Sequence, residues 1–216
     1  MESKLRDTLI TCISLIAAVC VWNMCCAVWN QLGRPLSGDD MTLGIELIGI
    51  ILVIILAATT SFKLRDMGLS FNHIGAVLLR AVVISVVGFA IIYAAKLLLE
   101  RYVPSYFKAG ASFCDWSKFK LSYPFTAFIQ EFLCRGVVQE SFDRMLPAKR
   151  RAARSIAITS LYFAAMHAFL GVTYMVGAAI LSAVLGIIYE KDRNIWGLTL
   201  IHFVLGNAAM VLQLVV

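Results

Sequence analysis

The chain has 216 residues, of which 61% are hydrophobic and 15% charged, and its formal net charge is +6. A soluble domain is close to half apolar and about one quarter charged, so this composition excludes an ordinary soluble protein and indicates an integral membrane protein. The positive charge does not indicate nucleic-acid binding, because the basic residues gather at the ends of apolar segments, where membrane topology signals lie.

Apolar runs long enough to cross a bilayer recur along the chain, and the length fits one membrane domain over residues 1–216. We expect seven membrane helices, at residues 8–29, 41–60, 76–99, 121–143, 154–171, 172–190 and 194–215. The predicted fold is therefore all-α, a polytopic bundle in which the fourth, fifth and seventh helices form a polar cavity.

The distribution of basic residues predicts the orientation of this bundle. With seven spans, 12 of the 19 Lys and Arg residues lie on one side, five lie on the other, and two lie within segments. Basic residues accumulate on the cytoplasmic side of membrane proteins, so we expect the N-terminus in the cytoplasm and a cytoplasmic (inner) membrane location.

The fourth segment carries two ionisable residues, Glu131 and Arg135. Their spacing of four puts both side chains on one helix face, where they can pair. An ionisable side chain at membrane depth costs about 2.5–3.5 kcal/mol on insertion scales, so such residues are functional candidates by default. Gln139 lies on nearly the same face, whereas Glu140 points away and is expected to be a surface or interhelix partner.

The fifth and seventh segments each carry one histidine, His167 and His202. At about 1.5 Å per residue from the cytoplasmic ends, Glu131 and His167 lie roughly 18–20 Å deep and His202 near 12 Å. Helix tilt brings all three within reach of one another. A carboxylate, a guanidinium and two imidazoles on three helices therefore predict a shared site.

These motifs resemble the CPBP family, which contains CAAX prenyl proteases and bacteriocin-processing proteins. Its members carry Glu-Glu-x-x-x-Arg, Phe-x-x-x-His and His-x-x-x-Asn, each on its own membrane helix. The counterparts here lie within residues 121–207 and are Gln130-Glu131 with Arg135, Phe163 with His167, and His202 with Gly206-Asn207.

Two positions depart from the family pattern. The first glutamate of the family's pair, which is assigned to catalysis, is Gln130 here, and glutamine cannot act as a general base. Either Glu131 takes over that role, or the chain is a variant with reduced or no hydrolytic activity. Asn207 follows His202 by five residues rather than four, and Gly206 occupies the expected place.

The resemblance implies peptide-bond hydrolysis by an activated water. Glu131 is the candidate base, because a buried carboxylate can take a proton from water. His167 would help to hold the water, and Arg135 would orient Glu131. Gln130 would hydrogen-bond the water or the substrate backbone.

The same resemblance implies that His202, with Asn207 if it turns inward, stabilises the developing oxyanion, a contribution of about 2.7–4 kcal/mol for one donor. The substrate would be a membrane-associated protein or peptide, such as a prenylated tail, a bacteriocin leader or a C-terminal sorting helix. The lipid bilayer is the other expected partner, and the oligomeric state is left open.

Three alternatives compete with this hypothesis. Glu131, His167 and His202 are also the ligand types of a three-ligand catalytic zinc site, although Arg135 beside the glutamate would repel a cation, so we expect no cofactor. A pseudoprotease would use the same cavity to bind and regulate membrane partners. A proton-coupled transporter would use the Glu-His network as a relay, but the chain has no internal repeat of the kind common in transporters.

Overall fold

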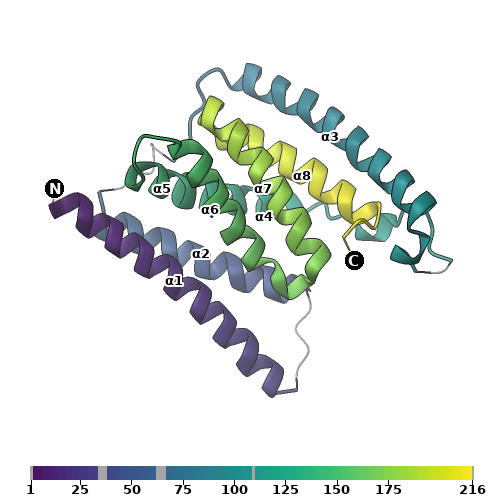
Figure 1. Cartoon of the computed structure of the whole chain (residues 1–216), viewed down its shortest axis with the longest axis horizontal. Coiled ribbons are helices and arrows are strands. Elements are labelled where there is room, and N and C mark those ends of the chain that lie inside the picture. Colours follow the sequence, from purple (N-terminus) through teal and green to yellow (C-terminus); the bar gives the residue numbers. More distant parts are fainter. Residues whose placement is uncertain (1, 34–37, 62–66, 109, 216) are drawn as a thin grey trace.

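The computed structural model describes residues 2–33, 38–61, 67–108 and 110–215. Every regular element in these ranges is helical and none is a strand, which confirms the all-α prediction. The α-helices of Figure 1 are α1 (Glu2–Gln31), α2 (Gly38–Thr59), α3 (Ile74–Tyr102), α4 (Tyr123–Glu131), α5 (Glu140–Met145), α6 (Arg151–Met166), α7 (Val172–Asp192) and α8 (Ile195–Val211). The described connections include the short 3-10 turns η2 (Pro104–Tyr106), η3 (Trp116–Lys118) and η5 (Ala168–Leu170).

The fourth predicted segment is continuous but not uniform. Between α4 and α5 the backbone runs as a π-helix, η4 (Phe132–Gln139), so residues 123–145 form one helical segment. Counted in this way, the described elements give the seven helical segments that the sequence predicts. Wide π turns are rare and occur frequently at functional sites, and this one begins directly after Glu131.

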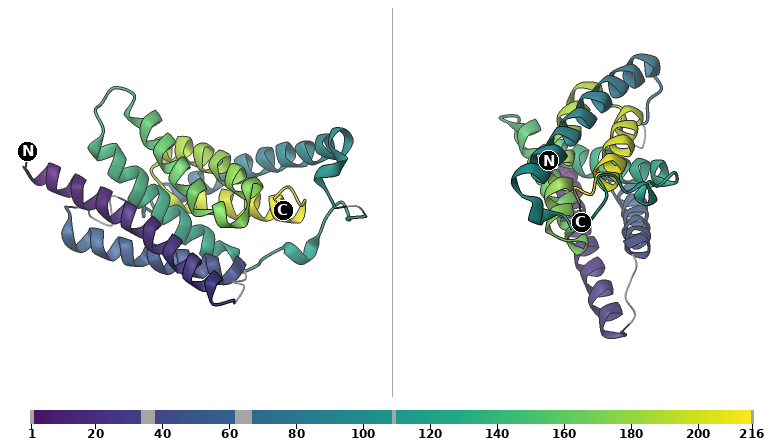
Figure 2. Two further views of the ribbon diagram at one scale, coloured as in Figure 1. Left: turned by 60° about the horizontal axis from the view of Figure 1, so that its bottom comes forward. Right: turned by 90° about the vertical axis from the view of Figure 1, so that its right-hand side faces the viewer.

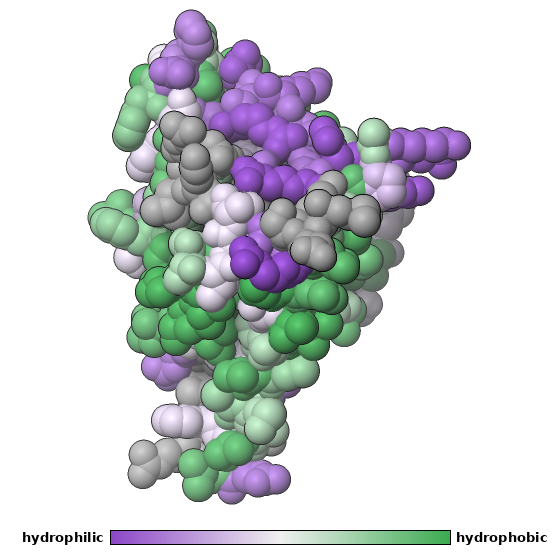
Figure 3. Space-filling model, turned by 90° about the vertical axis from the view of Figure 1, so that its left-hand side faces the viewer, coloured by the Kyte–Doolittle hydropathy of each residue, from purple (hydrophilic) through white to green (hydrophobic). Residues whose placement is uncertain are grey.

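Four helices in the described ranges are long and apolar enough to cross a membrane, namely α1, α2, α3 and α7. Only 17–28% of the residues in their most apolar stretches are buried inside the molecule, so most of their apolar side chains face outward. Figure 3 shows the result as a broad hydrophobic band beneath a hydrophilic end of the molecule. Such a band is the surface that a bilayer covers.

Helix α8 forms the centre of the half of the bundle that carries the predicted site. It contacts α3, α4 and α7, while α6 packs along α7 and α1 along α2 (Figures 1 and 2). The core around α8 is aliphatic and includes Leu185, Ile195, Leu198 and Ile201. Burying these side chains orders the helices that carry the polar residues, since each large aliphatic side chain contributes about 1.5–3 kcal/mol.

The first turn of α8 is fixed by hydrogen bonds. The Asn194 side chain accepts from the Trp196 N–H (3.0 Å) and donates to the Ser70 carbonyl (2.7 Å). Asparagine is a favoured N-cap because it satisfies an otherwise unpaired N–H of the first turn. His202 lies two turns further along, so these bonds also set its height in the bundle.

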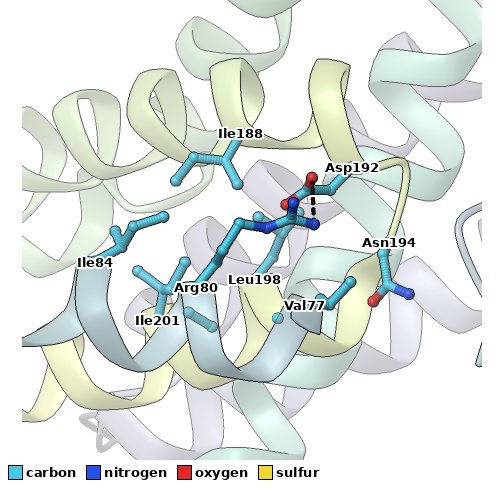
Figure 4. A pocket seen from close by; sticks show the side chains of 10 residues that line it. Val77, Arg80, Ile84, Ile188, Asp192, Asn194, Leu198 and Ile201 are labelled. Atoms are coloured by element: carbon cyan, nitrogen blue, oxygen red, sulfur yellow. Dashed lines mark ion pairs between the residues drawn. The ribbon is translucent and has the colours of Figure 1, made fainter. Parts of the chain in front are cut away.

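A salt bridge between Arg80 of α3 and Asp192 of α7 (2.9 Å) closes the same end of the bundle (Figure 4). Ile84 and Ile188 lie beside it, around a cavity of about 10 Å³. This volume is at the lower limit of what one water molecule needs, roughly 10–15 Å³. None of the predicted site residues lines this cavity. The salt bridge beside it joins α3 to the corner between α7 and α8.

Candidate functional site

Glu131 lies at the end of α4 with both carboxylate oxygens in hydrogen bonds. Oε2 accepts from Arg135 Nε at 3.1 Å, and Oε1 is 2.7 Å from His202 Nδ1 of α8. Glu131 and Arg135 are completely buried and His202 is 2% exposed. The pairing of Glu131 with Arg135 is confirmed, and the structure brings His202 to the same carboxylate. This contact agrees with the expectation that Glu131 and His202 lie within reach of one another.

Each of the three nitrogens of the Arg135 guanidinium donates a hydrogen bond. Besides Glu131, it donates to Gln139 Oε1 through Nη1 (3.1 Å) and to Ser182 Oγ of α7 through Nη2 (2.7 Å). A buried guanidinium is tolerated only when its donors are satisfied. Gly186 makes room for this arrangement, because a Cβ there would lie 3.1 Å from both Arg135 Nη1 and Gln139 Oε1.

A chain of polar contacts continues from Gln139 to the end of the bundle. Gln139 Nε2 donates to Glu190 Oε1 (2.8 Å), and Glu190 Oε2 pairs with Arg193 (2.8 Å). Arg193 also pairs with Glu140 (2.7 Å) and Asp143 (2.8 Å), so Glu140 is the interhelix partner that the sequence predicts. Burial alone would lower the pKa of the Arg193 guanidinium, but the three carboxylates outweigh it and raise that pKa, so Arg193 remains charged.

Gln130, the neighbour of Glu131, faces a cavity instead of the polar cluster. The cavity measures about 40 Å³ and is lined by residues of α1, α2, α4, η4 and α6, mostly aliphatic, such as Ile48 and Leu52. Its polar wall includes Gln130 and His167, and neither Glu131 nor His202 lines it. Gln130 is 7% exposed, and its Oε1 has no hydrogen-bond partner among the described residues. The volume exceeds the roughly 10–15 Å³ that one water needs, so a water fits in the cavity, although Gln130 Oε1 itself is shielded from it.

His167 ends α6 and is fixed by its own helix. Its Nδ1 lies 2.8 Å from the Phe163 carbonyl. A carbonyl oxygen can only accept, so Nδ1 carries the proton and a neutral ring keeps its lone pair on Nε2. The Phe163 ring lies between the two histidines, with ring centroids 4.3 Å from His167 and 5.9 Å from His202. The three predicted motifs therefore meet at one place.

Asn207 lies on α8 beyond His202 and contacts the chain before α4. Its Oδ1 accepts from the Lys120 N–H (2.9 Å), and its Nδ2 donates to the Phe203 carbonyl (3.2 Å). These bonds are to backbone groups, and they hold residue 120 against α8. An oxyanion role for Asn207 remains a prediction.

Two polar residues near this cluster were missed by the sequence reasoning. The Tyr123 hydroxyl lies 3.0 Å from His202 Nε2. Glu46 of α2 is 9% exposed, accepts a hydrogen bond from Thr126 of α4, and has one oxygen with no partner in the described chain. Glu46 was detectable, because it is an acidic residue inside the apolar segment 41–60, the same signal that identified Glu131.

The arrangement of Glu131 and His202 does not fit a zinc centre. Their 2.7 Å contact is a hydrogen bond, and the second carboxylate oxygen is taken by a guanidinium. His167 meanwhile directs Nδ1 to a backbone carbonyl. In the described part of the chain, no three His, Cys, Asp or Glu side chains are grouped to hold a metal ion. We therefore derive no step through a metal.

Comparison with known proteins adds one finding. Residues 112–207 match the family model described as Type II CAAX prenyl endopeptidase Rce1-like. This range contains all six predicted site residues and agrees with the family resemblance of the three motifs. Searches of curated proteins and of solved structures gave no match.

Proposed function

We propose that this integral membrane protein hydrolyses a peptide bond of a membrane-associated protein or peptide. The proposal starts from the match of residues 112–207 to the family model of CAAX-type membrane proteases of the CPBP family. Candidate substrates are a CAAX-type tail, a bacteriocin leader or a C-terminal sorting helix. The proposed orientation has the N-terminus in the cytoplasm. One observation carries the proposal: a carboxylate–imidazole pair lies next to a water-sized cavity whose wall includes Gln130 and a second imidazole, that of His167.

In the proposed reaction, the attacking water reaches Glu131 from the cavity that Gln130 and His167 line. The water oxygen bonds to the substrate carbonyl carbon, and its proton passes to Glu131. The C–N bond then breaks as the leaving amine takes up that proton. Arg135 keeps Glu131 ionised and oriented, because a cation in hydrogen-bonding contact favours the charged form of a carboxylate.

Each oxygen of Glu131 accepts one hydrogen bond in the resting arrangement and keeps a second lone pair, so the carboxylate can also accept a proton from water. The Nδ1–H of His202, which hydrogen-bonds Glu131, would also point at the developing oxyanion and stabilise it. Donors aimed at developing charge in a site without bulk water are among the largest contributions to catalysis.

The test uses the full chain reconstituted in lipid nanodiscs, with a farnesylated fluorogenic peptide ending in a CAAX sequence as the probe. We expect cleavage to fall roughly 10²–10⁴-fold in Glu131→Gln, the range lost with a general base. Glu140→Gln is the matched control, because this glutamate belongs to the ion cluster at the end of the bundle. Unchanged cleavage by Glu131→Gln would refute the base assignment.

Gln130→Glu separates an active enzyme from a pseudoprotease. This variant places a carboxylate directly in the cavity wall. If the wild type cleaves neither this probe nor precursor peptides of the other two classes, and Gln130→Glu does, the natural chain is the inactive, partner-binding form. If wild type and Gln130→Glu both cleave, the hydrolase proposal stands.

A further inference from the structure

Tyr123, at the first turn of α4, contacts His202 on the side opposite to Glu131. Its hydroxyl is 3.0 Å from His202 Nε2, and the two rings meet edge to face with centroids 5.7 Å apart. The other nitrogen, Nδ1, is 2.7 Å from Glu131 Oε1. Both nitrogens of this buried imidazole are therefore in hydrogen bonds with side chains of α4.

The chemistry of the three groups sets the direction of these bonds. The Glu131 carboxylate, paired with Arg135, only accepts, so His202 Nδ1 carries a proton. In the neutral ring Nε2 then has the lone pair, and the Tyr123 hydroxyl donates to it. The two hydrogen bonds therefore run in one direction: Tyr123 donates to His202, and His202 donates to Glu131. A histidine whose two nitrogens are both engaged is fixed in tautomer and in ring orientation.

Helix α8 is shaped to receive Tyr123. A Cβ at Gly206 would lie 2.6 Å from Tyr123 Cε1 and 2.7 Å from its hydroxyl oxygen, so the phenol occupies the space of the missing side chain. Glycine inside a helix is destabilising relative to alanine, and the contact with the phenol explains its presence here. The next residue, Asn207, binds the backbone of Lys120, three residues before Tyr123. Two consecutive residues of α8 thus position the phenol.

We propose that Tyr123 is a positioning residue that acts through His202. Its hydroxyl occupies the Nε2 lone pair and keeps the imidazole a neutral donor to Glu131, and Gly206 and Asn207 hold the phenol in place. The kinetic part of this inference rests on the proposed function. The Tyr123–His202 bond itself does not, so the two can fail separately.

The first measurement is spectroscopic and needs no activity. The chain has only three histidines, so ring-¹⁵N labelling gives three imidazoles that single substitutions assign. In Tyr123→Phe, which keeps the ring and removes the hydroxyl, we expect the Nε2 resonance of His202 to move downfield as its donor is lost. Tyr102→Phe, at a tyrosine that is 71% exposed on α3, is the matched control and leaves His202 unchanged. An unmoved Nε2 resonance in Tyr123→Phe overturns the proposal.

The second measurement is kinetic, in the nanodisc assay with the farnesylated probe. We expect Tyr123→Phe to lower kcat about fivefold with KM unchanged, because a net hydrogen bond contributes roughly 1 kcal/mol, which corresponds to a factor of about five. Gly206→Ala displaces the phenol and gives the same loss. Gly177→Ala is its control, since a Cβ there makes only an ordinary 3.4 Å contact with Val215.

The double variant Tyr123→Phe/Gly206→Ala decides whether the two residues act together. If Gly206 serves to seat the hydroxyl, the double variant loses no more than either single one. Additive losses, or a rise in KM with kcat unchanged, overturn the positioning role. If the wild type cleaves nothing while the ¹⁵N result holds, the proposed function fails and the Tyr123–His202 contact stands.

Discussion

Arg135→Met tests whether the buried polar cluster holds the bundle together. The substitution keeps the length and apolar stem of the side chain but removes three hydrogen bonds, to Glu131, Gln139 and Ser182. It also leaves the Glu131 carboxylate buried without a cation. Breaking a buried pair in this way costs about 3–5 kcal/mol, because the remaining charge is desolvated and uncompensated. We expect a loss of this size in the free energy of unfolding.

The chain contains its own control for this prediction. Arg144 pairs with Glu140 through Nε at 2.9 Å, with the same spacing of four residues, but its side chain is 35% exposed. Arg144→Met leaves Glu140 bonded to Arg193 (2.7 Å). Pairs of this kind contribute about 0–1 kcal/mol, so the two arginine variants should differ by several kcal/mol.

Equilibrium unfolding in mixed micelles, followed by circular dichroism, measures both variants under one condition. The double variant Glu131→Gln/Arg135→Met should recover more than half of the loss, because a neutral amide is much less costly to bury than an unpaired carboxylate. The reasoning is refuted if Arg135→Met costs no more than Arg144→Met. It is equally refuted if the double variant is less stable than Arg135→Met alone.

Three further predictions concern a glycine beside Arg135, a buried lysine of α3 and the effect of a chelator. Gly186→Ala should lower the free energy of unfolding by about 1–3 kcal/mol, measured in the same micelles, because its Cβ meets Arg135 and a neighbouring side chain of α6 at 3.1 Å. Lys96→Met should make the segment after α3 more sensitive to limited proteolysis. The buried ammonium lies 3.6 Å from the Phe107 ring centroid and 3.1 Å from Glu100, and a desolvated cation–π contact contributes about 2 kcal/mol. Prolonged dialysis against a chelator should leave cleavage of the farnesylated probe unchanged, and a loss restored by zinc alone would contradict the metal-free proposal.

The helices and one ion pair of the site could be predicted from local sequence. Apolar length identifies the segments, and the spacing of four predicts the contact of Glu131 with Arg135, which the structure confirms at 3.1 Å. The first inference needs only one continuous apolar run. The second needs only two residues about one helical turn apart. Their geometry is set by the helix itself, so no knowledge of tertiary packing is needed.

The contacts of His202 could not be predicted in the same way. Its two partners, Glu131 and Tyr123, are 71 and 79 residues away in the sequence. Whether α8 brings His202 to their level depends on where its first turn is anchored, and that anchor is the Asn194 bond to Ser70. Tyr123 in turn looks like an ordinary interfacial aromatic residue until its fit against Gly206 is seen.

The degree to which each polar group is satisfied divides the site into two parts. Each nitrogen of the Arg135 guanidinium donates to a side chain, and Gln139 bonds to side-chain and backbone groups through both its oxygen and its nitrogen. Gln130 has an unpartnered oxygen and His167 a ring nitrogen with a lone pair, and both residues line a cavity with room for water. Buried groups with complete hydrogen bonding stabilise a fold, whereas a buried group without a partner needs an explanation, of which a bound water or ligand is one. Variants of Arg135 and Gln139 should therefore lose stability before activity. Variants of Gln130 and His167 should lose activity before stability. Glu131 belongs to both parts, because Arg135 and His202 hold its carboxylate while a lone pair on each oxygen can still accept a proton from water.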